Sequence, residues 1–158
     1  MNMSRNNGKP EKSVSSPNTH NLCFTNIRGL RSNFQSLESF LIQNSPDFLA
    51  ISETNLKCDI SSSDFFVDGY LPLIRKDSLN YMHGLAVYVR NGVPIGRESR
   101  FESSDHPFMC FRLALPHSTS FLFFLYRSPS SHDCSVIDVV SDSIDQVLSL
   151  YPSANIMV

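Results

Sequence analysis

Two polar residues suited to phosphate chemistry each follow a short apolar run. Glu53 comes directly after residues 48–52 (FLAIS), and Asn26 comes directly after residues 22–25 (LCFT). A carboxylate at the end of a buried strand is held rigidly and faces solvent on one side. There a hard cation such as Mg²⁺ binds through one protein oxygen and keeps water and substrate phosphate as its other ligands. The pair therefore predicts half of a metal-dependent phosphodiesterase site, although for Glu53 taken alone a simple loop start is the plainer interpretation.

The composition indicates a folded globular chain with one core. The 158 residues are 41% hydrophobic and include 12 Phe, which is enough for a single domain. No apolar run approaches the ~20 residues that cross a bilayer, and the N-terminus lacks the apolar core of a signal peptide. We therefore expect an intracellular protein, nuclear or cytoplasmic, that is not secreted and has no membrane partner. The formal net charge of −2 argues against strong intrinsic affinity for DNA, because nucleic-acid binders usually carry a basic face.

The first half of the chain predicts a strand, a helix and a second strand. Residues 21–27 form an apolar run, residues 31–44 carry apolar side chains at helical spacing, and the second strand ends at Glu53. Ser32 and Gln35 have the spacing of a capping box at the start of the helix. Such a unit is typical of a layered α/β arrangement, in which the helix covers one face of a sheet.

The remainder predicts antiparallel strands, a second helix and a further strand. The expected elements are strands over 71–75, 85–90 and 95–101, a hairpin of strands over 108–115 and 120–126, a helix over 135–150, and a strand from 154 onward. Residues 121–125 are apolar at every position, which predicts a central strand covered on both faces. Arg75 and Lys76 are expected in a loop, as surface charge first and DNA contacts second. The five histidines show no metal-ligand spacing.

Four segments, taken in order, carry a resemblance to a known superfamily. They are 25–33 (TNIRGLRSN), 46–56 (PDFLAISETNL), 84–92 (GLAVYVRNG) and 125–129 (LYRSP). They resemble the endonuclease/exonuclease/phosphatase superfamily, and are most similar to the apurinic-type endonuclease domains of non-LTR (LINE-like) retrotransposons. The resemblance covers about residues 21–158 and implies an α/β (α+β layered) fold: a truncated four-layer α/β sandwich, with two mixed β-sheets flanked by helices.

The resemblance also implies roles for individual residues. Glu53 matches the acidic metal ligand, with Mg²⁺ (or Mn²⁺) as the implied cofactor, and Asn26 matches an Asn that organises the metal and phosphate site. Tyr126 matches a catalytic Tyr that contacts the scissile phosphate or the nucleophile. Arg127 is adjacent and would lend positive charge for DNA or phosphate binding, with an exposed strand end as an equal alternative. The implied function is that of a fragment of a metal-dependent phosphodiesterase domain, whose parent nicks DNA for retrotransposon integration and carries a reverse-transcriptase domain downstream.

The sequence departs from the family pattern at its end. Residues 1–20 are polar and predict a disordered leader, and residues 21–158 match only the N-terminal part of the family domain. The match stops before the family's Gly-Asp-x-Asn segment, and the later Asp and terminal His are also absent. We therefore expect no appreciable cleavage of DNA by this chain alone, and partly uncovered apolar faces on residues 108–115 and 121–125. Two alternatives stay open: a remnant without catalytic activity, and a fragment of a superfamily phosphatase or phospholipid phosphodiesterase.

Overall fold

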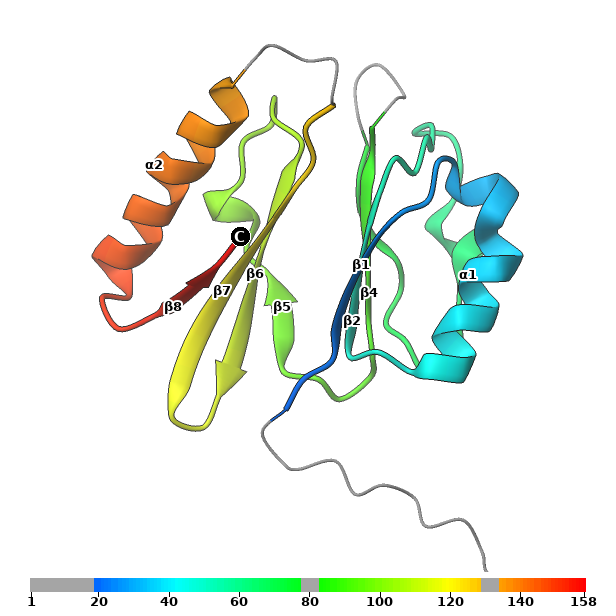
Figure 1. Ribbon diagram of the computed structural model, residues 1–158, viewed down its shortest axis with the longest axis horizontal. Coiled ribbons are helices and arrows are strands. Elements are labelled where there is room, and N and C mark those ends of the chain that lie inside the picture. Colours follow the sequence, from blue (N-terminus) through cyan, green and yellow to red (C-terminus); the bar gives the residue numbers. More distant parts are fainter. Residues whose placement is uncertain (1–18, 78–82, 129–133) are drawn as a thin grey trace, which may run out of the picture.

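The chain forms two four-stranded sheets and two α-helices, which a computed structural model describes over residues 19–77, 83–128 and 134–158 (Figure 1). Along the chain the elements are β1 (Leu22–Asn26), α1 (Leu30–Asn44), β2 (Phe48–Ser52), β3 (Ile74–Lys76), β4 (Leu85–Val89), β5 (Ile95–Arg97), β6 (Phe108–Leu115), β7 (Ser118–Leu125), α2 (Ser135–Leu150) and β8 (Asn155–Met157). Short 3₁₀ turns lie at Ser62–Phe65 and Ser99–Phe101. Residues 1–18 of the predicted leader lie outside the described residues.

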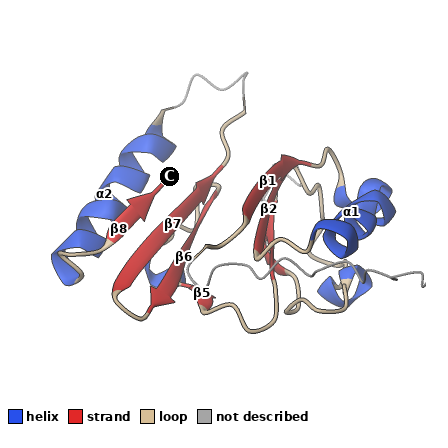
Figure 2. Ribbon diagram, turned by 60° about the horizontal axis from the view of Figure 1, so that its bottom comes forward, coloured by secondary structure: helices blue, strands red, loops and turns tan. Residues whose placement is uncertain are grey.

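The elements stack in four layers, in the order α1, first sheet, second sheet, α2 (Figures 1 and 2). The first sheet has the strand order β1-β2-β4-β3 and the second has the order β5-β6-β7-β8. Each sheet contains one parallel pair, β1 with β2 and β7 with β8, and its other pairs are antiparallel. The predicted four-layer sandwich, with two mixed sheets between helices, is confirmed.

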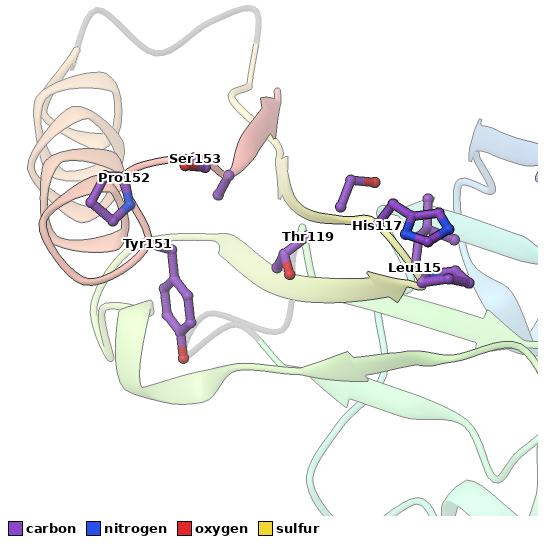
Figure 3. A pocket seen from close by; sticks show the side chains of 9 residues that line it. Leu115, His117, Thr119, Tyr151, Pro152 and Ser153 are labelled. Atoms are coloured by element: carbon purple, nitrogen blue, oxygen red, sulfur yellow. The ribbon is translucent and has the colours of Figure 1, made fainter.

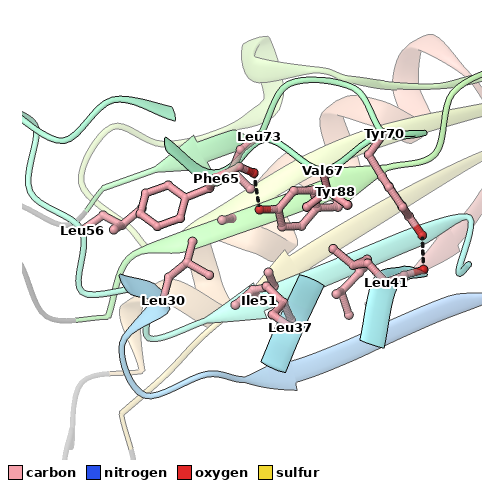
Figure 4. Packing of buried hydrophobic residues seen from close by; sticks show 12 residues of the cluster. Leu30, Leu37, Leu41, Ile51, Leu56, Phe65, Val67, Tyr70, Leu73 and Tyr88 are labelled. Carbon is pink, nitrogen blue, oxygen red and sulfur yellow. Dashed lines mark hydrogen bonds between the residues drawn. The ribbon is translucent and has the colours of Figure 1, made fainter. Parts of the chain in front are cut away.

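The first sheet is covered on both faces, which explains why β2 is apolar along its length. Leu49 and Ile51 pack toward α1, in the cluster that contains Leu41 (Figure 4). Phe48 and Ala50 point the other way, into the core between the two sheets. Successive side chains of a strand point to opposite faces, so a strand covered on both faces needs an apolar residue at every position.

The second sheet follows the same rule around β7. Phe121 and Phe123 pack in the cluster beneath α2, whereas Leu122 and Phe124 face the first sheet. The predicted central strand is therefore confirmed. The expectation that its apolar faces are partly uncovered is wrong within the described residues, because all four of these side chains are buried beneath α2 on one side and the first sheet on the other.

The start of α1 differs from the predicted capping box. Gly29 is the N-cap, with a φ of 103°, and no side chain in the described part of the chain caps the helix. The first free backbone N–H groups are satisfied from another segment: Gly29 donates to the carbonyl of Glu53 at 2.8 Å, and Leu30 donates to the carbonyl of Thr54 at 2.8 Å. A backbone partner brought by the fold has replaced the expected Ser32–Gln35 pair.

Arg75 and Lys76 lie in β3 rather than in the expected loop; for Arg75 this agrees with the strand predicted over 71–75. Lys76 extends across the sandwich and donates to the carbonyl of Phe108 at 3.1 Å. Burial is the largest effect on this amine, and it lowers the pKa of Lys76. Lys76 therefore joins the first sheet to the second.

Among the described residues, neither helix has the length and apolar character that a membrane crossing requires.

Candidate functional site

Three predicted site residues meet at one end of the sandwich, although they come from both sheets. The parallel pairing of β1 with β2 sets Asn26 opposite Ser52, so that Asn26 lies beside Glu53, the next residue. Tyr126 directly follows β7 of the second sheet, and its hydroxyl donates a hydrogen bond to Oε1 of Glu53. The structure therefore brings together Asn26, Glu53 and Tyr126, as the resemblance implies.

Glu53 is held in its ionised form by its neighbours. The hydrogen bond from Tyr126 is the largest cause, the hydrogen bond from Asn26 the second, and together they lower the pKa of Glu53 against a smaller opposing effect of burial. Electrostatic effects of His83 and Arg28 lower the pKa of Glu53 further. A carboxylate that is ionised well below neutral pH is the form that a divalent cation needs.

Tyr126 is held in its neutral, proton-donating form. Burial and then the hydrogen bond to Glu53 raise the pKa of Tyr126 from 10.0 to about 12. The phenol ring packs against the core between the sheets, while its hydroxyl reaches the carboxylate. At neutral pH the pair consists of a phenol donor and a carboxylate acceptor, with the proton on the phenol.

The turn that carries Glu53 is fixed by close contacts with the start of β4. The N–H of Thr54 donates to the carbonyl of Gly84 at 3.0 Å. The side chain of Thr54 is buried, and its Oγ1 has no hydrogen-bond partner among the described residues. A side chain at position 84 would collide with that Oγ1, so only glycine fits. The site carboxylate therefore has a rigid backbone beneath it.

An unusual backbone conformation also gathers at this place. Four residues other than glycine have left-handed φ angles here: Arg28 (49°), Glu53 (56°), Asn55 (51°) and His83 (74°). Such angles are uncommon outside glycine, and clusters of them are typical of functional sites whose surroundings enforce the strain. For Arg28 the enforcing contact is local, because its N–H donates to Oδ1 of Asn26 at 3.1 Å.

Two residues of this site, Arg28 and His83, were not assigned to it from the sequence. Arg28 lies in the first resemblance segment, and a basic residue two positions after Asn26 is the only signal that would have pointed to it. His83 was not predicted because the histidines lack metal-ligand spacing. It belongs to the site through the contact of its ring with that of Tyr126. Arg127 was predicted, and the structure places it beside Tyr126 as an exposed residue whose Nη1 donates to Sγ of Cys134 at 3.7 Å. Its contact with phosphate stays a prediction.

The donor set can be tested against the implied cation. Among residues 19–77, 83–128 and 134–158, no three His, Cys, Asp or Glu side chains gather as a ligand cluster. One carboxylate and one amide remain, and this sparse oxygen set fits Mg²⁺, which keeps several waters and takes substrate phosphate as further ligands. Glu53 would hold the ion, with Asn26 beside it.

Two cavities lined by described residues lie away from this site. One, of about 460 Å³, is lined by the β6–β7 turn and the segment after α2, including His117 and Tyr151, at the opposite end of β7 from Tyr126 (Figure 3). The other, of about 420 Å³, lies between β1 and α1 and is lined mainly by apolar groups, Phe24 and Phe40 among them. Neither contains a residue that was predicted for the site.

Comparisons with known proteins identify the fold. No protein-family model and no curated protein sequence matches the chain. The AP endonuclease LMAP from Leishmania major superimposes with a TM-score of 0.57 at 18% identity, over 84% of this chain and 47% of that one. The endonuclease domain of TRAS1, a telomere-specific non-LTR retrotransposon, gives 0.53 at 11% identity, over 81% and 53%. TDP2 from Caenorhabditis elegans gives 0.61 at 13% identity, over 87% and 45%.

These solved structures belong to the endonuclease/exonuclease/phosphatase superfamily. At such low identity the likeness establishes the fold alone, and the chain spans about half the length of the structures that it matches. The chain therefore has the fold that these endonuclease/exonuclease/phosphatase superfamily structures share.

Proposed function

We propose that this chain supplies the cation- and phosphate-binding part of a metal-dependent phosphodiesterase, whose parent protein nicks DNA for retrotransposon integration. The observation that carries the proposal is the meeting of Asn26, Glu53 and Tyr126 at one end of the sandwich, with Glu53 ionised and Tyr126 protonated. The fold supports it as well, since two of the solved structures that share it are named as endonucleases, one of them from a non-LTR retrotransposon.

Each residue has a distinct part in this proposal. Glu53 holds Mg²⁺ (or Mn²⁺), and Asn26 supports the carboxylate by a hydrogen bond. The cation, when bound, neutralises charge on the phosphate and so favours attack on it. Tyr126 orients the carboxylate and presents its hydroxyl toward the phosphate. Arg28, which is exposed, and Arg127 beside Tyr126 add the local positive charge that a chain with a net charge of −2 otherwise lacks.

The proposal divides the work between this chain and its parent. Since the chain spans about half the length of the solved structures, binding of cation and phosphate is proposed for the chain, and hydrolysis for the whole protein. The proposal includes two features of the parent protein. Residues 21–158 form the N-terminal part of its endonuclease domain, and a reverse-transcriptase domain lies downstream.

Titration of the chain with Mn²⁺ tests the proposal directly, with binding followed by paramagnetic broadening of NMR signals. We expect saturable broadening of the backbone signals of Glu53 and Asn26, and its loss in Glu53→Ala. Glu38→Gln is the matched control, because Glu38 lies on α1 and its removal leaves the site intact. Absence of saturable binding, or binding that Glu53→Ala leaves unchanged, contradicts the proposal and favours a remnant without activity.

The DNA part of the proposal has its own test. A labelled duplex with an abasic site is titrated with the chain at several salt concentrations, in the presence of Mn²⁺. Arg28→Ala and Arg127→Ala are each expected to weaken binding and to make it less sensitive to salt, because phosphate contacts release counterions. Equal affinity and equal salt dependence in both variants would exclude these arginines as phosphate contacts.

A further inference from the structure

His83 lies against the ring of Tyr126 at the site. The ring centroids are 5.3 Å apart and the ring planes differ by 26°, which is a stacked arrangement. His83 comes shortly before β4 of the first sheet, whereas Tyr126 follows β7 of the second. The stack therefore joins the two sheets at the end where Glu53 lies.

The backbone of His83 is tied to the turn that carries Glu53. Its N–H donates to Oδ1 of Asn55 at 3.4 Å, and the carbonyl of the next residue, Gly84, accepts from Thr54 at 3.0 Å. Because Gly84 also fits tightly against Thr54, residues 83–84 and the Glu53 turn form one unit. An imidazole on this unit thus has a fixed position relative to the carboxylate.

The conformation of His83 shows that the surroundings enforce its place. Its φ of 74° is left-handed, a region in which glycine rests without strain and in which Asn, Asp and His are the most tolerated of the other residues. A glycine would satisfy the backbone alone. The backbone conformation at position 83 does not require a side chain, so the imidazole ring has a role separate from it.

We propose that His83 is a positioning residue whose ring confines the phenol of Tyr126 to the orientation in which its hydroxyl donates to Glu53. Stacking of the imidazole against one face of the phenol limits rotation of the Tyr126 ring. The hydrogen bonds that join residues 83–84 to the Glu53 turn set the distance between the Tyr126 hydroxyl and the Glu53 carboxylate. The inference rests on the proposed function, because a fixed hydroxyl on Glu53 matters for catalysis only if Glu53 holds the cation.

A double-mutant cycle on the unfolding equilibrium of the full chain tests the proposal without any need for activity. Tyr126→Phe removes only the hydroxyl and is made in three backgrounds: wild type, His83→Asn and His83→Phe. Asn tolerates the left-handed backbone but has no ring to stack, whereas Phe keeps an aromatic ring. Any backbone cost of the substitution at position 83 is common to both arms of its cycle and cancels.

We expect Tyr126→Phe to raise the unfolding equilibrium constant by about fivefold or more in the wild type and with His83→Phe, and by less than about twofold with His83→Asn. Rescue by Phe separates positioning by the ring from a merely structural role of the backbone. The same effect of Tyr126→Phe in all three backgrounds would overturn the proposal. If His83→Asn does not fold, His83→Gln provides the comparison without a ring.

Mn²⁺ titration of the same variants separates this inference from the proposed function. If His83→Asn and Tyr126→Phe weaken Mn²⁺ binding by the same factor, and the double variant by no more, both proposals are supported. Coupling in the unfolding cycle without Mn²⁺ binding to the wild type sinks the proposed function and leaves the positioning contact intact. Mn²⁺ binding that Tyr126→Phe weakens but His83→Asn does not change overturns the role of His83.

Discussion

The hydroxyl of Tyr126 donates a hydrogen bond to Oε1 of Glu53, across a separation of 73 residues in the sequence. The two residues follow β7 and β2, which belong to different sheets. The contact therefore depends on the docking of one sheet on the other, and its two partners shift each other's proton affinity in opposite directions. Several measurable consequences arise from this arrangement.

Removing the hydroxyl should destabilise the protein. Tyr126→Phe leaves the ring in the core but deprives the carboxylate of the hydrogen bond from the phenol, and we expect a loss of about 1–2 kcal/mol in the free energy of unfolding at neutral pH. The estimate stays at the low end for a charge-assisted bond because water reaches Glu53. Urea unfolding measures the change. Tyr151→Phe is the control, since its hydroxyl accepts a bond from the exposed Arg100, and a smaller effect of Tyr126→Phe than of this control would count against the assignment.

Acid should weaken the fold through Glu53. The folded-state pKa of Glu53 lies below its ordinary value of 4.5, so the stabilisation is present above pH 4.5 and is lost as the pH falls through the lower folded value. Glu53→Gln cannot be protonated in this range, so its free energy of unfolding should fall less steeply with acid. Parallel acid slopes for the two proteins, measured by urea unfolding at several pH values, would show that Glu53 is not stabilised as described.

Alkali should act through Tyr126. Its folded-state pKa is about 12 against an ordinary value of 10.0, so its stabilisation is complete below pH 10 and is lost as the pH rises through 12. The tyrosinate absorbance that is lost in Tyr126→Phe reports this single titration. We expect Glu53→Gln to move it down, but not fully to 10, because burial is the larger cause and remains. A Tyr126 that titrates near 10 in the wild type contradicts the contact.

The close approach of Gly84 to Thr54 should be sensitive to one added carbon. Gly84→Ala places a methyl group where Thr54 Oγ1 lies, and overpacking of this kind costs about 1–3 kcal/mol. Thr54→Ala removes the obstructing oxygen, which no hydrogen bond holds within residues 19–77, 83–128 and 134–158, and should recover part of the loss in the double variant. Thermal unfolding of the four proteins measures the recovery. Strictly additive effects would mean that the two residues do not touch.

The core between the sheets should dominate stability. Phe111 is fully buried there and makes an edge-to-face contact with Phe48, with ring centroids 5.1 Å apart. Phe111→Ala should cost about 3–5 kcal/mol. Phe66→Ala is the control, because 58% of Phe66 is exposed and surface changes usually stay within about 0.5 kcal/mol. Similar losses in urea unfolding for the two variants would contradict the two-sheet core.

Local patterns in the sequence predicted most elements of the fold, because a strand that is buried on both faces appears in the sequence as an uninterrupted apolar run. Residues 48–51 of β2 and residues 121–125 of β7 are apolar at every position, and both strands are covered on both sides there. The capping box at Ser32 failed because a capping side chain is needed only where no backbone carbonyl is nearby, and the carbonyl of Thr54 arrives from a distant segment. Such a partner is invisible to any local pattern.

The site was predictable only in part, for a related reason. Asn26 and Glu53 were found because strand ends of a parallel pair meet at one edge, which residue spacing reveals. Tyr126 directly follows a strand of the other sheet and was predicted through the family resemblance, since nothing in its own segment points to Glu53. His83 acts through a left-handed backbone and a ring contact across the sheets, and neither property has a signature in its neighbours.

The phenol of Tyr126 belongs to two environments at once, with its ring against the apolar interior between the sheets and its oxygen on an ionised acid. A fluctuation that slides one sheet relative to the other must separate the Tyr126 hydroxyl from the Glu53 carboxylate. This separation precedes extensive exposure of the apolar side chains between the sheets to water. Loss of the Tyr126–Glu53 hydrogen bond and opening of the core between the sheets are thus coupled. A spectroscopic probe of the Tyr126 phenol would therefore report two properties in one signal: whether the two sheets are packed together, and whether Glu53 is held in the orientation for cation binding.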